Sequence, residues 1–291
     1  MSHKSKESLF YQAYNVLHAK FRPGESKYEA KKDGTASNYI YSIVTLENYL
    51  DVAKQFTKFC RKQYHCKILA ECRPHVDDYL RYRADYSAWT VKKDASALGK
   101  LFDCSTKEFT KTGSRHRAEI RRSRVPAVRD GHFSETRNAD LVTFCRSTGL
   151  RRSEVAAVRG TDYEIHNGIM YIHVIKGKGG KERYAMVIGD KDAVMRMMDN
   201  AGDQKVFPRV HSAADIHGYR AEYAAALYLK YARPIEEVPK KERYHCQGEL
   251  DCEYDRKAML VVSRSLGHNR VSVIAQSYLY RVSTDCNCAR Q

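Results

Sequence analysis

The spacing of apolar residues changes near the middle of this 291-residue chain, and the change limits the folds that it can adopt. Between residues 40 and 105 apolar side chains recur three or four positions apart, which predicts three helices, the first with Thr45 as its N-cap. Beyond residue 132, helical stretches surround two strand-like runs, 170–174 and 184–188, which are joined by a turn rich in glycine and lysine. We therefore predict a mainly α-helical protein with a small antiparallel β-sheet in its second half.

Changes in composition predict where the domains meet. The chain is long enough for two domains of ordinary size. A polar stretch with Pro and Gly follows the first expected helix, Glu7–Ala19, and we expect deletion of residues 1–35 to leave the activity of the remainder intact. The predicted segments are an N-terminal extension (1–39), a helical domain (40–108), a basic linker (109–131) and a mixed α+β domain (132–291) with a polar surface insertion at about 233–254.

The formal net charge is +16, and a chain this basic most often binds a polyanion, above all nucleic acid. The linker supports this interpretation, although a solvated flexible linker would have the same composition. No stretch has the ~20 apolar residues of a membrane span, and the N-terminus lacks the apolar core of a signal peptide. We expect a cytoplasmic protein whose linker contacts DNA through Arg115, Arg117, Arg121, Arg122 and Arg124.

The nine cysteines give no metal site of standard spacing. Their odd number argues against a fully paired disulfide framework, and cytoplasmic thiols stay reduced. The pairs Cys246/Cys252 and Cys286/Cys288 do not have the spacing of a zinc site. We predict no metal and no cofactor.

Four segments carry side chains suited to attack on a phosphodiester: TGLRRSE (148–154), IKGKGGKER (175–183), HGYR (217–220) and HNRVSVIAQSY (268–278). A tyrosine hydroxyl, with a pKa of about 10, is a poor nucleophile unless cations surround the phosphorus. Arginine forks clamp phosphate oxygens, a lysine on a flexible turn can protonate the leaving 5′ oxygen, and histidines can pass protons. The candidate catalytic residues are Arg151, Lys178, His217, Arg220, His268 and Tyr278.

Each candidate also has an ordinary structural interpretation. Arg151 beside Arg152 could be a solvated helix start, and the glycine–lysine turn could be a simple hairpin loop. On that turn we predict that Lys178 is catalytic and that Lys176 and Lys181 contact DNA. A tyrosine in a chain with 21 of them could belong to a core. The order of the four segments favours the catalytic interpretation.

In this order the four segments resemble the catalytic boxes of the tyrosine recombinases of the phage-integrase family, over roughly residues 133–281. The region 40–105 is similar, less specifically, to that family's core-DNA-binding domain. The resemblance implies a C-shaped clamp of two domains on DNA, cleavage through a 3′-phosphotyrosyl bond, and recombination in a tetramer through a Holliday junction. It also implies that Tyr278 attacks, that the other five candidates assist, and that Glu154 supports the active-site shell; a charge on an exposed helical turn explains Glu154 equally well.

The polar insertion, a short tail and one spacing depart from the family pattern. Tyr278 follows His268 by ten residues, one more than is usual in the family, and the usual spacing falls on Ser277. Tyr280 is a second nearby tyrosine. If 271–277 is a short helix, one extra residue rotates the side chain by about 100°, which a bulged turn can absorb. We therefore predict Tyr278 as the nucleophile.

The sequence favours a site-specific DNA recombinase, an integrase of a mobile genetic element, that needs neither metal nor ATP. A type IB-like topoisomerase would use the same residues. A catalytically silent DNA-binding regulator would keep the same clamp, but the intact catalytic set argues against it. We expect double-stranded DNA as partner, a homotetramer on DNA with monomers or dimers when free, accessory DNA-bending proteins, no membrane, and a location in the bacterial cytoplasm or nucleoid.

Overall fold

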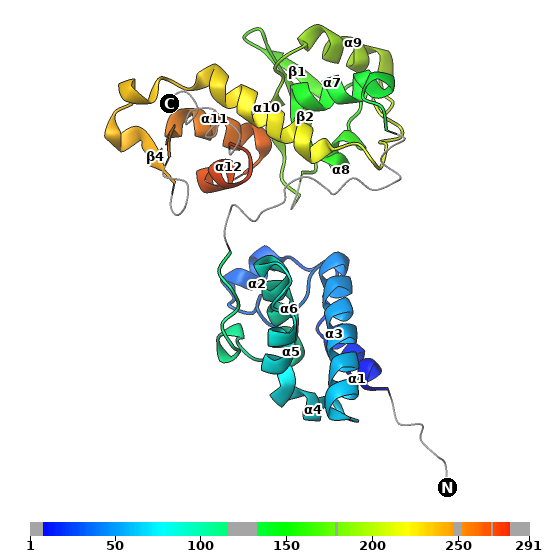
Figure 1. The fold of residues 1–291 in the computed structure, drawn as a ribbon. Helices are drawn as coiled ribbons and strands as arrows, with labels where there is room; N and C mark the ends of the chain where they lie inside the picture. The colour runs from blue at the N-terminus through cyan, green and yellow to red at the C-terminus, as the bar shows by residue number, and fades with distance from the viewer. Residues whose placement is uncertain (1–7, 116–132, 178–179, 247–251, 269, 280–291) are drawn as a thin grey trace. The chain divides into compact units, whose positions relative to one another are not determined.

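The computed structural model describes residues 8–115, 133–177, 180–246, 252–268 and 270–279. The chain divides into two compact units, residues 1–120 and 121–291 (Figure 1). Buried apolar side chains form one cluster in the described part of the first unit and two in that of the second. The division falls inside the stretch that the sequence predicts as a basic linker.

In its described part, the first unit consists of helices joined by loops, with one isolated parallel β-bridge between Phe21 and Ile40. Phe56 of α3, Tyr79 of α5 and Leu98 of α6 are buried in its core, and the rings of Phe56 and Tyr79 meet edge to face with centroids 5.3 Å apart. The helices are α1 (Leu9–Ala19), α2 (Lys27–Lys32), α3 (Ile43–Tyr64), α4 (Leu69–Cys72), α5 (Val76–Tyr82) and α6 (Ala88–Leu101), with 3-10 turns η1 (Arg73–His75) and η2 (Thr106–Glu108).

Ser42, rather than Thr45, caps α3. The Ser42 Oγ accepts a hydrogen bond from the amide of Thr45 at 3.2 Å, so the helix begins three residues before the predicted start. Ile43 and Val44 are both exposed, which explains why the apolar spacing did not include them.

Helix α1 is part of the first core. Leu9, Ala13 and Leu17 are buried, and α1 packs against α3 and α6. The helix itself was predicted, but its packing partners lie far along the chain and leave no local signal. Deletion of residues 1–35 would remove α1 and expose the apolar surfaces of α3 and α6 that it covers, which argues against the expectation that the segment is dispensable.

The second unit contains a three-stranded antiparallel sheet in the order β1-β2-β3: β1 (Tyr163–His166), β2 (Ile169–Val174) and β3 (Arg183–Met186). Residues of β2 alternate between buried and half-buried, which places Met170, Ile172 and Val174 in the core. The sequence predicted β2 and β3 but not β1, because β1 is short and its Ile165 is exposed. The fold is mainly α-helical with a small antiparallel sheet, as predicted.

Helix α10 joins the two apolar clusters of this unit. It contacts α7 on one side and α11 on the other, and Figure 1 shows it running across the unit between them. The helices are α7 (Ala139–Thr148), α8 (Arg152–Val155), α9 (Lys191–Ala201), α10 (Ile216–Tyr231), α11 (Arg256–Leu266) and α12 (Val271–Ser277), with a 3-10 turn η5 (Thr136–Asn138).

The predicted surface insertion at about 233–254 is partly buried. It forms the 3-10 turns η6 (Ile235–Glu237) and η7 (Lys240–Glu242) and the antiparallel pair β4 (Arg243–His245) and β5 (Glu253–Asp255). Val238 and Tyr254 are only 1% and 3% exposed, so the purely surface interpretation was wrong. Isolated apolar residues in a polar run do not create a periodic signal, and sequence spacing therefore missed both.

Within the described ranges, none of the helices is both long and apolar enough to cross a membrane. The same residues include no group of three or more His, Cys, Asp and Glu side chains placed to hold a metal ion.

Candidate active site

Tyr278 lies directly after α12 with its side chain buried, only 4% exposed. Its amide donates to the carbonyl of Ile274 at 3.0 Å, which fixes it at the helix end. Its hydroxyl accepts a hydrogen bond from Nε of Arg220 at 3.2 Å and lies 3.1 Å from Nε2 of His268. The HGYR segment (217–220) and the segment 268–278, which are far apart in the sequence, therefore meet at one phenol oxygen.

Arg220 lies in the second turn of α10 and is 1% exposed. Its terminal nitrogens donate to the carbonyls of Leu266, at 2.7 Å, and of Gly149. Burial lowers the pKa of its guanidinium, which favours an anionic partner for this cation. These contacts use three of the five N–H donors of arginine within the described part of the chain, which leaves two for an anion.

Gly149 permits this arrangement. It ends α7 with a φ of 60°, where glycine is favoured, and a Cβ on it would lie 2.2 Å from the ring of Tyr223. The break between α7 and α8 thus brings a main-chain carbonyl to Arg220.

Arg151 stands beside Arg220. It precedes α8, and its guanidinium donates to Glu154 at 2.8 Å and to the carbonyl of Leu266 at 3.1 Å. The same carbonyl accepts from Arg220, so the two guanidinium groups are neighbours. Their repulsion further lowers the pKa of Arg220, although less than burial does, and an anion between them would relieve it.

Glu154 is buried beneath Arg151 and pairs with a second arginine. Both carboxylate oxygens accept from Arg183, each at 2.8 Å, and Nε of Arg183 donates to the carbonyl of Ser265 at 2.9 Å. Burial alone would raise the pKa of Glu154, but the Arg183 fork and the bonds from Arg151 outweigh it and lower the pKa to about 2. Glu154 is therefore ionised and orients both arginines.

Arg183 was not among the residues that the sequence predicted. It is the last residue of the IKGKGGKER segment, in which the lysines of the turn carry a charge that could reach a leaving group. Its side chain is 8% exposed and its Cδ fills the space above Gly267, where a Cβ would lie 2.6 Å away. The sequence feature that could have indicated it is its position directly before the predicted strand 184–188.

Two histidines flank Tyr278. The ring centroid of His268 lies 5.6 Å from that of Tyr278, and the His217 centroid lies 6.0 Å from it. The main chain of His268 is fixed by its amide, which donates to Ser263 at 2.8 Å, and by its carbonyl, which accepts from Ser263 Oγ at 2.9 Å. His217 lies exposed on the first turn of α10, which Asp215 caps by accepting from Gly218.

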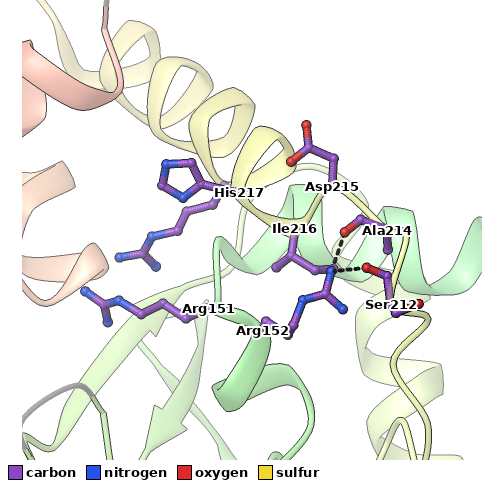
Figure 2. Close-up of a pocket in the computed structure, with 8 residues that line it drawn as sticks. Arg151, Arg152, Ser212, Ala214, Asp215, Ile216 and His217 are labelled. Atoms are coloured by element: carbon purple, nitrogen blue, oxygen red, sulfur yellow. Dashed lines mark hydrogen bonds between the residues drawn. The ribbon is translucent and has the colours of Figure 1, made fainter. Parts of the chain in front are cut away.

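A cavity of about 480 Å³ lies beside this cluster, and Arg151, His217 and Arg220 are among the residues that line it (Figure 2). In Figure 2 Arg151 and His217 point to the same side of it, whereas Arg152 turns toward the carbonyls of Ser212 and Ala214. Arg152 thus holds the loop before α10, and the remaining cations face the cavity. The lining residues are Arg151, Arg152, Ser212, Ala214, Asp215, Ile216, His217 and Arg220.

The glycine–lysine turn is only partly within the described residues. Lys178 lies outside them. Lys181 is exposed and lines a second hollow of about 410 Å³ that also includes Arg151 and His268. Lys176 is exposed and lines a different, largely apolar hollow with Ile172 and Val174, so the structure does not bring it to Tyr278.

Arg115 lies in the first unit, Ser277 lies at the end of α12, and the remaining residues named from the sequence lie outside the described ranges. The guanidinium of Arg115 is exposed and lies 5.6 Å from the ring of Trp89 in the first unit. Ser277 is half-buried, and the hydrogen bonds from Arg220 and His268 meet the side chain of Tyr278 instead. Outside the described residues lie Arg117, Arg121, Arg122, Arg124 and Tyr280.

No protein-family model matches the sequence, and neither does any curated protein. The structure is similar to a XerH site-specific recombinase bound to a palindromic difH substrate in a post-cleavage complex. The two share 16% sequence identity, the match covers 99% of each chain, and the TM-score is 0.55. XerH in a pre-cleavage complex with difH gives 16% identity, 98% and 97% coverage and a TM-score of 0.53. The predicted tyrosine-recombinase fold is confirmed by these matches, which extend over both units.

Proposed function

We propose that this protein is a site-specific DNA recombinase in which the hydroxyl of Tyr278 attacks a DNA phosphodiester. The observation that carries the proposal is the meeting of Arg220 and His268 at that hydroxyl, at 3.2 and 3.1 Å. Arg151 stands beside Arg220 on the shared Leu266 carbonyl, at the edge of the cavity. The likeness of the fold to a site-specific recombinase supports the same conclusion.

The donor and acceptor pattern gives the tyrosine proton a destination. Nε of Arg220 can only donate, so the hydroxyl oxygen accepts from it and keeps its own proton for another partner. Nε2 of His268 is within reach of that proton when it is the unprotonated ring nitrogen. In the proposed step the phenol oxygen bonds to phosphorus while its proton passes to His268.

The bond between phosphorus and the 5′ oxygen breaks in the same step. The product is a 3′-phosphotyrosyl bond and a free 5′-hydroxyl strand, whose oxygen takes a proton from Lys178 in this proposal. Arg151 and Arg220 stabilise the charge that builds on the non-bridging oxygens, and His217 donates to one of them. A 5′-hydroxyl then attacks the phosphotyrosyl bond and rejoins DNA, so the phosphodiester energy is conserved and ATP is not needed.

The proposed partner is double-stranded DNA, which the formal net charge of +16 favours. Exchange of strands between two sites requires a homotetramer on DNA, with a monomer or dimer when free and accessory DNA-bending proteins. Insertion of a mobile genetic element is the biological role that we assign to this exchange.

Covalent capture on duplex DNA of random sequence tests this proposal, because the protein itself selects the site that it cleaves. Purified protein is mixed with the duplex fragments in EDTA, and DNA that stays bound after denaturation is sequenced; a nicked substrate is then made from the enriched sequence. We expect an adduct that maps to Tyr278, that Tyr278→Phe abolishes while DNA binding persists, and that the matched Tyr280→Phe variant retains.

An adduct on Tyr280, or none in any condition, would contradict the proposed function. A dependence on magnesium would indicate a nuclease-like mechanism instead. Relaxation of supercoiled DNA that lacks the enriched sequence would favour the topoisomerase alternative.

A further inference from the structure

The main chain around Tyr278 is held on both sides, and the two restraints come from different elements. On the N-terminal side, the amides of Tyr278 and Leu279 both donate to the carbonyl of Ile274 within α12, at 3.0 and 3.1 Å. On the C-terminal side, the carbonyl of Leu279 accepts a hydrogen bond from the hydroxyl of Tyr254 at 3.1 Å. Tyr254 belongs to β5 of the insertion, so this second restraint is not part of the helix.

Tyr254 is itself fixed inside the apolar cluster that α10, α11 and α12 form. It is 3% exposed, and its ring meets that of Tyr228 edge to face with centroids 5.6 Å apart. Opposite it in the β4–β5 pair is Tyr244. A buried ring of this size has little rotational freedom, so the position of its hydroxyl is fixed.

The residue after Tyr254 fastens the strand pair to two helices. Asp255 is fully buried, accepts from the Arg233 guanidinium at 2.8 and 3.0 Å, and caps α11 through the amide of Lys257. Its own amide donates to the hydroxyl of Tyr228 at 2.9 Å. The β4–β5 pair is therefore firmly attached to α10 and α11 beside the last described residues.

We propose that Tyr254 is a positioning residue that holds Tyr278 in line for attack, through its hydrogen bond to the Leu279 carbonyl. This inference rests on the proposed function, because it gives the insertion a role in that reaction. Without the Tyr254 hydroxyl, the Leu279 carbonyl loses its hydrogen bond to β5, and the chain at the end of α12 can shift and carry the phenol oxygen away from Arg220 and His268. Misplacement of a reacting group by about 1 Å can cost about 100-fold in rate.

The test compares Tyr254→Phe with the matched control Tyr228→Phe. Each variant removes one hydroxyl from the same pair of packed rings and from the same cluster, but the Tyr254 hydroxyl donates to Leu279, whereas the Tyr228 hydroxyl accepts from the amide of Asp255. Three quantities are measured for both: the single-turnover rate of covalent-adduct formation at saturating protein, the affinity for DNA, and amide hydrogen exchange over residues 271–279.

For Tyr254→Phe we expect adduct formation to slow about 10- to 100-fold, faster exchange at the end of α12, and unchanged DNA affinity. Tyr228→Phe is expected to lower the melting temperature but to keep the wild-type cleavage rate and the wild-type exchange over 271–279. A wild-type rate in Tyr254→Phe, or equal slowing in both variants, would overturn the positioning role.

Failure of the proposed function would look different. Wild-type protein would then form no adduct at all, whereas hydrogen exchange in the free protein would still show whether Tyr254 restrains this segment. Unchanged exchange in Tyr254→Phe would overturn the restraint itself, whatever the protein does to DNA.

Discussion

Two buried carboxylates of the second unit, Glu154 and Asp255, each accept two hydrogen bonds from one arginine guanidinium group, but their surroundings differ. The Glu154 side chain is 2% exposed and its partner Arg183 is 8% exposed. The Asp255 side chain is 1% exposed, but its partner Arg233 is 36% exposed. The first pair is therefore sealed from water on both sides, and the second only on the carboxylate side.

The charge balance also differs. Arg151 and Arg183 bond to the carboxylate of Glu154, and Arg220 shares the Leu266 carbonyl with Arg151, so three guanidinium groups accompany one buried carboxylate. Around Asp255, Arg233 and Lys257 are balanced by Asp255 and Glu242. An uncompensated cluster is suited to bind an anion, whereas a balanced one is suited to join structural elements. An arginine–carboxylate pair therefore orients cations for anion binding at Glu154, whereas at Asp255 it connects structural elements.

The largest expected effect is that of Glu154→Gln. The amide keeps the shape of the side chain but leaves the buried guanidinium of Arg183 without an opposite charge, which should lower the free energy of unfolding by about 3–5 kcal/mol. Adduct formation should fail even at temperatures where the variant is folded, because Arg151 loses its orientation. Urea denaturation and the covalent-capture assay measure the two effects.

Asp255→Asn should cost less, about 1–2 kcal/mol, because the amide still caps α11 and water can reach Arg233. The matched control is Glu242→Gln, which removes the outer carboxylate of the same cluster and should cost less again. If Asp255→Asn destabilises the protein as much as Glu154→Gln does, the difference in partner exposure does not govern these pairs.

Most of the residues that meet at Tyr278 were predicted from the sequence, but one supporting arginine was not. Arg151, Arg220, His268 and Tyr278 were all predicted, because residue type and order reflect the demands of phosphoryl chemistry. Arg183 supports that chemistry without touching the proposed substrate, so nothing in the chemistry singled it out.

Contacts between distant parts of the chain were also not predicted from the sequence. Tyr254 reaches Leu279 and α1 reaches α3 across parts of the chain that share no local pattern. The helices with strong apolar periods were found, whereas the exposed strand β1 and the strand pair of the insertion were not. A short polar strand has too few buried residues to create an alternating pattern.

The smallest expected difference between the two carboxylates is in how the free energy of unfolding depends on pH in acid. The pKa of each is about 2, below the ordinary values of 4.5 for Glu154 and 3.8 for Asp255. For Asp255 the hydrogen bonds from Arg233 are the main cause; for Glu154 burial acts in the opposite direction and the bonds from Arg183 overcome it.

Because folding lowers both pKa values, ionised Glu154 and Asp255 stabilise the fold. This stabilisation is complete above the unfolded pKa values, near pH 4 to 5, and is lost as the pH falls through that range toward 2. Each group can change the free energy of unfolding by at most about 1.4 kcal/mol per pH unit. The free energy of unfolding is measured with urea at several pH values between about 5 and 2. Its dependence on pH should be weaker than in the wild-type protein in both variants, and weaker in Glu154→Gln than in Asp255→Asn, because folding lowers the pKa of Glu154 further. An unchanged slope in Glu154→Gln would mean that its carboxylate is not ionised against Arg183, and the contrast between the two clusters would be lost.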